Sequence, residues 1–564
     1  MPLTDAAQAP PKPVMAFHVG GTGHRHLPGA DAAGLQRAAA GLFRTIREAI
    51  LELHASDQAQ AAPLYQPEPP GLRYLCGLAE GADAILAEAA LGEGWDLVAV
   101  LPFDPDEYAA DFSGSALDRY RSLLARAASV CSLDGDRDAG TAYADIGELV
   151  VGQSDLLLAV WNGLPARGPG GTAEVVQMAL RRGLPVAVLP PSGPCVPAWL
   201  GGDPGDVATI LRAALLPPKG DDGFPDAYFA DRSRGAGLPQ AAVRTYERLF
   251  TIGFSQPAPM PPDPATPATP AAVALDAAFG PADRLASEYA ARYRAAGLMR
   301  YGLILPATLA SLVGWYGVGW HQAAGNLAAF AVLVFIVWFS TPSWWEPSHR
   351  RFIAYRALAE YLRNARLLAV LGAVAQIPGA AAHHEKAADW TAWYGRAVVR
   401  QQGLSSVRFD PRQVAQAAGF VRGEAAGQIG FLLRRAAGFD IMARRLMQIG
   451  VALSICGTAF SGVRAAMLLA GAGPSILHEF NEMALVLPAM APVFLGLLSF
   501  NEYRRLATRY RAVAAELQVQ VAALDRAPPR RAAVLPIARR IAEVMLAETA
   551  DWQLIIKAKT VSAY

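Results

Sequence analysis

Short apolar runs alternate with helix-like stretches over the first third of the chain. The apolar runs cover residues 14–19, 72–76, 97–101, 130–133, 156–161 and 186–189, and the stretches 32–54 and 172–182 have the spacing of helices. Short buried strands that alternate with helices are typical of a doubly wound parallel sheet with helices on both faces. We therefore predict an α/β domain over residues 14–200.

The pattern changes in the second half, where four long stretches contain almost no charged residue. They cover residues 301–320, 325–342, 446–470 and 483–500. A helix of about 20 residues rises about 30 Å, which is the thickness of the hydrocarbon core of a bilayer. We therefore predict an all-α membrane domain with four transmembrane helices, and a lipid bilayer as its partner.

A proline-rich segment separates the two halves. Residues 256–272 read QPAPMPPDPATPATPAA, which is typical of an extended, semi-rigid linker. Residues 201–255 before it are expected to be an insertion or a bridging segment. The remainder divides into two units, 273–400 and 401–564, each with two of the apolar stretches.

The two membrane units share an order of sequence features. YRALAEYL at 355–362 follows the second apolar stretch, and YRAVAAEL at 510–517 follows the fourth. Ala-Asp-Trp then occurs at 388–390 and again at 550–552. This shared order indicates duplication of one unit. The apolar three-four spacing of both arginine-rich helices predicts a cytoplasmic helical bundle.

Basic residues flank the outer ends of each pair of apolar stretches. They are Arg292, Arg294, Arg300, Arg350, Arg351, Arg356, Arg434, Arg435, Arg444, Arg445, Arg504, Arg505 and Arg509. The positive-inside rule then predicts a multi-pass protein of the inner (cytoplasmic) membrane with both termini in the cytoplasm. The first residues, MPLTDAAQAPPKPV, lack the apolar core of a signal peptide, which agrees with a cytosolic first domain.

Composition and charge narrow the choice of partners. Hydrophobic residues make up 53% of the chain and charged residues only 18%, which favours a membrane protein. Lys and Arg total 50 against 49 Asp and Glu, so there is no basic excess and no nucleic-acid partner is expected. The four cysteines lie far apart without a CxxC pair, so we expect no metal site and a reduced compartment.

Glycine-rich turns follow three of the expected strands, and such turns lie together at the carboxyl edge of a parallel sheet, where ligands bind. The glycines and free amides of these turns, with Arg25, suit a phosphate group. The candidate ligand-binding residues are Gly20, Gly21, Thr22, Gly23, His24, Arg25, Gly77, Glu80, Gly81, Asp83, Pro102, Trp161, Gly170, Gly171, Thr172 and Glu174.

Each of these signals also has a purely structural interpretation. Asp83 could bind a ribose hydroxyl or only cap the helix that begins near it. Glu174 is expected in the first turn of a helix, where the helix dipole favours a carboxylate whatever its function. Three such turns at one sheet edge nevertheless favour a nucleotide cleft.

The ordered segments GTGHR, GLAEGADAILAEAAL, LPFDPDEYAADF and SDLLLAVWNG with GGTAEVVQMAL resemble the SLOG superfamily of Rossmann-like nucleotide-binding domains over residues 14–191. More distantly, they resemble the ligand-binding amino-terminal domain of melastatin-type cation channels. The membrane half resembles two SLATT domains, two-helix membrane effectors, fused in tandem. The resemblance implies a nucleotide-type ligand, which would be ADP-ribose, an NAD derivative or a cyclic nucleotide, and no cofactor.

The enzyme branch of that superfamily, which includes cytokinin-activating phosphoribohydrolases, carries a PGGxGTxxE motif. Here residues 169–174 read PGGTAE, which is shorter between the glycines and Glu174. The arginine that works beside this glutamate in the enzymes also has no counterpart. A sensing pocket without a catalytic residue is therefore favoured over a hydrolase site.

The leading hypothesis is a nucleotide-gated membrane effector, an ion channel or pore, that acts as a homo-oligomer. The resemblance implies a role in bacterial antiphage defence through growth arrest or death of the infected cell. One alternative is a membrane-anchored nucleotide hydrolase with Glu174 and Glu80 as acid and base. A second is a small-solute transporter, which the scarcity of charged coupling groups in the apolar stretches disfavours.

Overall fold

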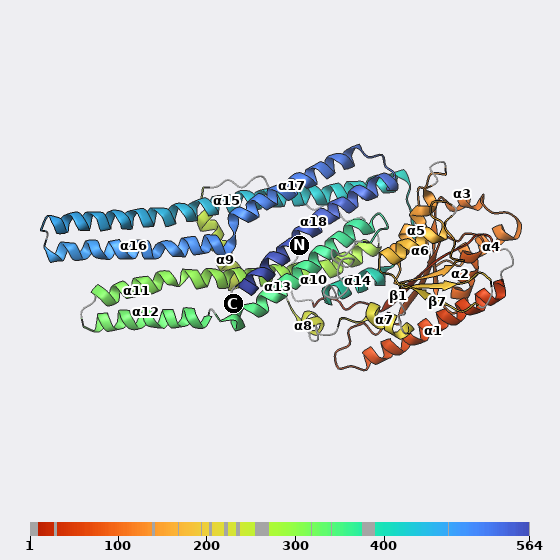
Figure 1. Ribbon diagram of the computed structural model, residues 1–564, viewed down its shortest axis with the longest axis horizontal. Coiled ribbons are helices and arrows are strands. Elements are labelled where there is room, and N and C mark those ends of the chain that lie inside the picture. The colour runs from red at the N-terminus through yellow and green to blue at the C-terminus, as the bar shows by residue number, and fades with distance from the viewer. Residues whose placement is uncertain are drawn as a thin grey trace.

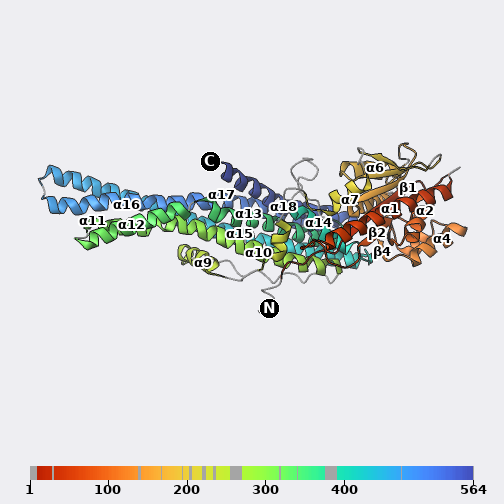
Figure 2. The ribbon, with the colours of Figure 1, turned by 90° about the horizontal axis from the view of Figure 1, so that it is seen from below.

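The computed structural model describes residues 9–562 except 28–30, 138–140, 167, 193–194, 202–205, 219–223, 233–236, 254–269, 317–318, 340, 375–389 and 472. The protein is elongated, with a sheet and its helices at one end and pairs of long helices extending to the other (Figure 1). The view from below shows the same separation of the two parts (Figure 2).

An eight-stranded sheet forms the centre of the α/β part, in the order β7-β6-β5-β1-β2-β3-β4-β8. Its strands are β1 (Ala16–Gly23), β2 (Gly71–Cys76), β3 (Asp96–Leu101), β4 (Ser129–Ser132), β5 (Leu156–Val160), β6 (Val186–Leu189), β7 (Ala198–Leu200) and β8 (Val407–Arg408). Only the β6–β7 pair is antiparallel. This confirms the predicted parallel α/β region. The edge strand β8 comes from the second half of the chain.

Helices connect the strands of the parallel part. They are α1 (Ala32–Gln58), α2 (Ala82–Gly92), α3 (Pro105–Ala109), α4 (Gly114–Ala125), α5 (Ala142–Gln153) and α6 (Thr172–Arg181). Helix α1 packs against α2, and α5 packs against α6. All five residues of β5 are buried, which explains why its sequence is a continuous apolar run rather than an alternating one.

Three helices occupy the segment expected to be an insertion or a bridge. They are α7 (Val207–Leu215), α8 (Phe224–Ala230) and α9 (Leu238–Thr251). Helix α7 packs against α1 of the α/β part, and α9 packs against the long helices. Tyr228 of α8 is fully buried between Tyr355 and Trp390, with both ring centroids 5.1 Å away. The segment therefore contacts both parts of the protein. Most of the expected proline-rich linker, 256–269, lies outside the described residues.

The described residues of the second part form nine helices, most of them long. They are α10 (Pro270–Gly302), α11 (Ile304–Tyr316), α12 (Trp320–Phe339), α13 (Pro342–Ala369), α14 (Trp390–Gln402), α15 (Pro411–Leu469), α16 (Pro474–Asn501), α17 (Tyr503–Arg526) and α18 (Arg531–Ser562). Helix α11 pairs with α12 and α15 with α16, so two hairpins form the distal end. In each unit the helix before the hairpin packs against the helix after it, α10 on α13 and α15 on α17.

The two hairpins therefore have matching arrangements, in agreement with the sequence repeat. Ala388 and Asp389 of the first Ala-Asp-Trp echo lie outside the described residues, and the second echo is part of α18.

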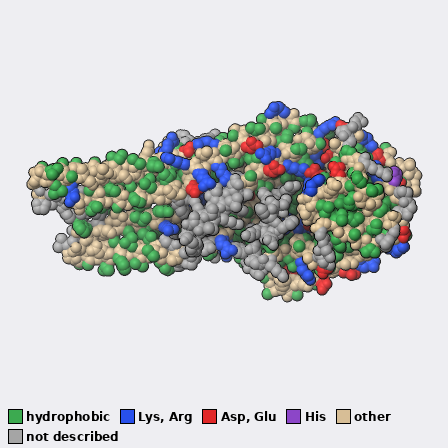
Figure 3. Space-filling model, in the orientation of Figure 1, with side chains coloured by type: hydrophobic (Ala, Val, Ile, Leu, Met, Phe, Trp, Pro, Cys, Tyr) green, Lys and Arg blue, Asp and Glu red, His purple; other side chains and the backbone are tan. Residues whose placement is uncertain are grey.

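Three helical stretches among the described residues are long and apolar enough to cross a membrane. They lie in Trp320–Trp338, Pro411–Leu469 and Met483–Arg526. Their surface is apolar: Leu327, Phe330 and Val337 of α12 are each about two-thirds exposed or more. Charged side chains are sparse on the visible face of the hairpins and frequent on the rest of the molecule (Figure 3). These features indicate a membrane protein.

The predicted number of four spans is not confirmed. The stretch expected at 301–320 is divided, because α10 ends at Gly302 and α11 has only 13 residues. Residues 317–318 at its far end lie outside the described part. The other three predicted stretches overlap the three helical segments that are long enough, although the stretch expected at 325–342 extends past Trp338, where its segment ends.

Candidate functional site

The order of the strands creates a switch point beside β1. The chain runs from β1 through β2 and β3 to β4 on one side, and returns to β5 on the other side of β1. In open parallel sheets of this kind, ligands bind beyond the carboxyl ends of the strands at the switch point. The three glycine-rich segments follow β1, β2 and β5, so the fold brings them to this one edge.

The first of these segments is less of a loop than the sequence predicts. Strand β1 continues through Gly20, Gly21, Thr22 and Gly23, and Gly23 pairs with Val160 of β5. A Cβ on Gly20 would lie 2.4 Å from the Ser154 hydroxyl oxygen, and one on Gly21 would lie 1.8 Å from the Tyr74 hydroxyl. These two glycines therefore make room for neighbouring side chains, and the expected turn begins only at His24.

His24 ties the end of β1 to both of its neighbours. Its carbonyl accepts a hydrogen bond from the Ala82 amide at 3.1 Å, and its Nε2 lies 3.0 Å from Oδ1 of Asn162. Gly81 has φ +84°, and a Cβ there would lie 2.2 Å from the carbonyl oxygen of Arg25. Glycine is required at 81 because the backbone of the turn after β2 packs directly against the backbone of the turn after β1.

Arg25 and Asp83 lie in the same part of this edge. The Arg25 guanidinium lies 4.5 Å from the ring centroid of Tyr143. Asp83 is buried and accepts a hydrogen bond from the Ala79 amide at 3.3 Å. Burial raises the pKa of Asp83 to about 6, although nearby Arg25 opposes this rise. A cation and a carboxyl that is easily protonated therefore share one environment.

The turn after β5 contacts Tyr143, the same residue whose ring lies beside Arg25. Gly170 has φ +74°, and a Cβ there would lie 2.4 Å from the carbonyl carbon of Tyr143. The Gly170 amide donates to Oε2 of Glu174 at 2.8 Å, and Thr172 is the buried first residue of α6. Glu174 lies in the first turn of α6, as expected, and its carboxylate also closes the turn before the helix, a contact that the sequence did not predict. Gly171 is the N-cap of α6.

The remaining predicted residues have separate places. Gly77 lies next to Asp83, since a Cβ on Gly77 would lie 3.3 Å from the Asp83 carboxylate. Glu80 is exposed in the turn before α2. Pro102 is buried, and its carbonyl accepts from the Gly135 amide at 3.0 Å. The Trp161 indole donates to the Leu164 carbonyl at 2.9 Å, within its own loop.

Sequence reasoning missed the aromatic and charged wall of this edge. The Tyr143 hydroxyl donates to Asp111 at 2.8 Å, and Arg137 pairs with Asp111 at 2.6 Å. Arg137 also lies 4.2 Å from the ring centroid of Phe103. Phe103 and Asp111 lie within the LPFDPDEYAADF segment, but Tyr143 comes from the start of α5, which none of the quoted motifs covers.

A separate cavity of about 530 Å³ lies at the opposite, amino ends of β5 and β6. Its walls include Arg182, Arg396 and Arg400, and none of the predicted site residues lines it. Among the described residues, no group of three His, Cys, Asp or Glu side chains is placed to hold a metal ion.

Comparison with models of protein families, with curated proteins and with solved structures finds no match for this chain.

Proposed function

We propose that this protein is a nucleotide-sensing, ligand-gated membrane effector. The ligand would bind at the carboxyl edge of β1, β2 and β5, and the helical hairpins would respond in the bilayer as an ion channel or pore. The observation that carries the proposal is the meeting of Arg25, Asp83 and the turn at Gly170 around Tyr143. Three turns from separate strands supply a cation, backbone amides and a carboxyl at a switch point, which suits a phosphorylated small molecule.

The way in which the second part joins the sheet supports a mechanical link. The edge strand β8 pairs with β4, and α15 begins three residues after it at Pro411. Helix α15 then continues for 59 residues, or about 90 Å at about 1.5 Å per residue, and includes a candidate span. A rotation at the sheet edge would therefore move the membrane end of the same rigid helix.

Two further contacts would transmit such a movement. Arg73 of β2 donates to the carbonyls of Arg400 and Gln401 at 2.9 and 3.1 Å. The amide of Arg531, at the start of α18, donates to Asp134 at 2.6 Å. Helices α14 and α18 are thus attached to the sheet independently of β8.

The free energy needed for gating is within reach of such a site. A shift of a two-state population from 1:99 to 99:1 needs a difference of about 5.5 kcal/mol between the affinities of the two states. Charge-assisted hydrogen bonds contribute about 1.5–3 kcal/mol each, so roughly two to four phosphate contacts made in one state only would be sufficient.

The ligand class is ADP-ribose, an NAD derivative or a cyclic nucleotide, and the effector acts as a homo-oligomer in the cytoplasmic membrane with both termini inside. Two hairpins per chain provide too few helices to line a pore, so several chains would line it together. The proposed biological role is antiphage defence through membrane disruption, which rests on the resemblance to SLOG and SLATT domains.

The test is ion flux through liposomes that contain the full chain, titrated with ADP-ribose, NAD and cyclic nucleotides. One of these is expected to increase flux, and Arg25→Gln is expected to raise the half-maximal concentration at least tenfold. Arg121→Gln is the matched control, because Arg121 is exposed on α4 and belongs to none of the three turns. Tight nucleotide binding without any flux would refute gating, and absence of binding would refute the site itself.

A further inference from the structure

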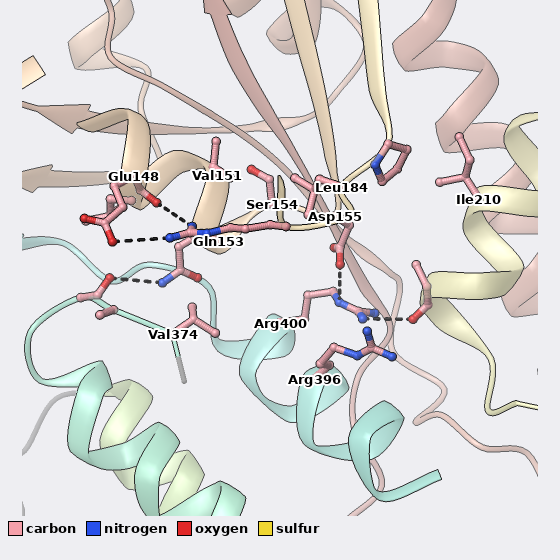
Figure 4. Close-up of a pocket in the computed structure, with 18 of the residues that line it drawn as sticks. Glu148, Val151, Gln153, Ser154, Asp155, Leu184, Ile210, Val374, Arg396 and Arg400 are labelled. Atoms are coloured by element: carbon pink, nitrogen blue, oxygen red, sulfur yellow. Dashed lines mark hydrogen bonds and ion pairs between the residues drawn. The ribbon is translucent and has the colours of Figure 1, made fainter. Parts of the chain in front are cut away.

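The cavity at the amino ends of β5 and β6 lies between the two parts of the protein. Its walls come from α5, the start of β5, the turn before β6, α7, the residues after α13, and helices α14 and α18. Figure 4 shows the carboxylate of Asp155, from the α/β part, pointing toward Arg400 of α14, with Arg396 one turn away on the same helix. A volume of about 530 Å³ is in the range of small-molecule sites.

The walls carry an excess of positive charge. Five arginines line the cavity, namely Arg182, Arg396, Arg400, Arg531 and Arg539, against the two carboxylates of Glu148 and Asp155. Glu148 is already shared, since it pairs with Arg182 at 3.4 Å and also with Arg539. Asp155 pairs with the Nε of Arg400 at 2.9 Å. The lining therefore retains three positive charges that no carboxylate of the cavity neutralises.

One of these arginines has a buried donor without a hydrogen-bond partner, and a second is not bonded to the side chains around it. Arg400 is 6% exposed; its Nε and Nη2 donate to Asp155 and to the Ala214 carbonyl, but its buried Nη1 has no hydrogen-bond partner. No hydrogen bond or ion pair joins Arg396 to the other side chains drawn in Figure 4. A buried, unpaired donor on a charged group costs free energy unless a ligand pairs with it.

The electrostatic state of the arginines agrees with an incomplete site. Partial removal from water lowers the pKa of Arg396, although part of its side chain remains exposed, and the neighbouring Arg400 lowers it further. Burial likewise lowers the pKa of Arg531, whose Nε donates to the Leu371 carbonyl at 2.8 Å. Like charges held close together in an enclosed space repel each other, and a bound anion would remove that repulsion.

We propose that this cavity binds a small anion that carries two or more phosphate groups. Arg396 and the free Nη1 of Arg400 would hold one phosphate group, and guanidinium groups match phosphate oxygens in geometry as well as in charge. Val151, Leu184 and Ile210 form an apolar side of the cavity, which suits the organic part of a nucleoside polyphosphate. This site is distinct from the proposed gating site, because the two lie at opposite ends of the strands.

An anion at this position would join the two parts of the protein. Arg182 and Asp155 belong to the α/β part, whereas Arg396, Arg400 and Arg539 belong to α14 and α18. A ligand held by both sets would resist their separation. Occupancy of the cavity would therefore adjust how strongly the sheet is coupled to the long helices.

The test is calorimetric titration of the full chain in lipid nanodiscs with inorganic tripolyphosphate, followed by competition with ATP. The variant is Arg396→Gln, which removes a partly exposed cation that forms no hydrogen bond or ion pair with the side chains drawn in Figure 4. We expect saturable tripolyphosphate binding that weakens roughly tenfold or more in Arg396→Gln, since one charge-assisted contact is lost. Arg396→Lys should recover part of the affinity, and Arg121→Gln should leave it unchanged.

The arms of this experiment separate the sites and the ligand sources. Arg25→Gln should leave tripolyphosphate affinity unchanged, which distinguishes this cavity from the gating site. Displacement of tripolyphosphate by ATP supports a nucleoside polyphosphate, and its failure supports an inorganic phosphate chain in the same cavity. Absence of saturable binding to the unmodified protein, or equal affinity of Arg396→Gln and Arg121→Gln, would overturn the proposal.

Discussion

The guanidinium of Arg25 lies over the ring of Tyr143, 4.5 Å from its centroid. This contact joins the turn after β1 to the start of α5, which are 118 residues apart in the chain. The same tyrosine is anchored through its hydroxyl to Asp111 and through its backbone against Gly170. Tyr143 therefore fixes the position of the only cation that the sequence assigned to the ligand.

Replacement of the Tyr143 ring should weaken nucleotide binding. Tyr143→Leu removes a cation–π contact of about 0.5–2 kcal/mol, so the Kd is expected to rise roughly twofold to thirtyfold. Tyr143→Phe keeps the ring but loses the hydroxyl, which bonds to Asp111 and also interacts with Arg25, so its Kd should rise less than that of Tyr143→Leu. Calorimetric titration measures both, and equal losses in the two variants would show that the ring is not what positions Arg25.

The raised pKa of Asp83 predicts a pH dependence of stability. The carboxyl holds its proton more tightly in the folded state, with a pKa of about 6, than in the unfolded state, where the value is near 3.8. Stability is therefore lost as pH rises from about 4 through the folded pKa, by up to about 3 kcal/mol, and the loss is nearly complete at about pH 7. Asp83→Asn stays neutral, so its unfolding temperature relative to the unmodified protein should increase between pH 5 and 7.5 in scanning calorimetry. A constant difference across this range would contradict the assignment.

The same titration should affect an anionic ligand. Ionised Asp83 repels a phosphate group near Arg25, so nucleotide affinity is expected to fall between pH 5 and 7.5 in the unmodified protein. The fall should be smaller in Asp83→Asn.

The contact made by Glu174 distinguishes a sensor from a hydrolase. Glu174→Gln retains an oxygen that can accept from the Gly170 amide, so the turn and ligand binding should persist with a change in Kd of less than about fivefold. Chromatography of NAD and nucleoside monophosphates after incubation with the protein should show no turnover in either form. Turnover by the unmodified protein that disappears in Glu174→Gln would instead establish the hydrolase alternative.

Gly457 permits close packing of α15 on α16. A Cβ on Gly457 would lie 2.3 Å from the ring of Pro488, whereas one on Gly462 would meet nothing within 4 Å. Gly457→Val should therefore destabilise the hairpin by about 1–3 kcal/mol and lower the unfolding temperature in detergent. Gly462→Val carries the same change of residue in the same helix and is the control. Equal behaviour of both variants would argue against this packing.

The proposed orientation places both hairpin tips outside the cytoplasm. His321 lies at the start of α12 and Gly473 at the N-cap of α16, so cysteines at these two positions should react with a membrane-impermeant maleimide on intact cells. Cys456 is exposed and would first be replaced by serine. Arg126→Cys, in the α/β part, should react only after lysis. Labelling of Arg126→Cys on intact cells would show that the orientation is the reverse of the proposed one.

The fold class was predictable because it depends on local patterns. The continuous apolar run of β5 and the three-four spacing of α1 identify a buried strand and an amphipathic helix within their own few residues. The edge strand β8 was not predictable, since Val407 and Arg408 are too few to form a pattern. The span expected at 301–320 was not confirmed, because the apolar character of a stretch does not reveal where a helix is interrupted.

The glycine-rich segments show how one residue type serves two purposes. Gly81 and Gly170 permit close passage of chains at the candidate site, as the sequence predicts, but Gly20 and Gly21 belong to β1 and make room for Ser154 and Tyr74. A sequence pattern does not separate these cases, because the neighbour that fills the space of the missing side chain comes from elsewhere in the chain.

The sequence by itself determined that an α/β region precedes apolar helices, because backbone hydrogen bonding and burial impose periods of a few residues on any strand or helix. Only the tertiary structure decided that Tyr143 stands beside Arg25, and that Arg182, Arg396 and Arg531 face one cavity. Some of these residues are hundreds of positions apart in the chain. Their proximity follows from how strands and helices pack. Packing depends on long-range contacts, which leave no periodic trace along the chain.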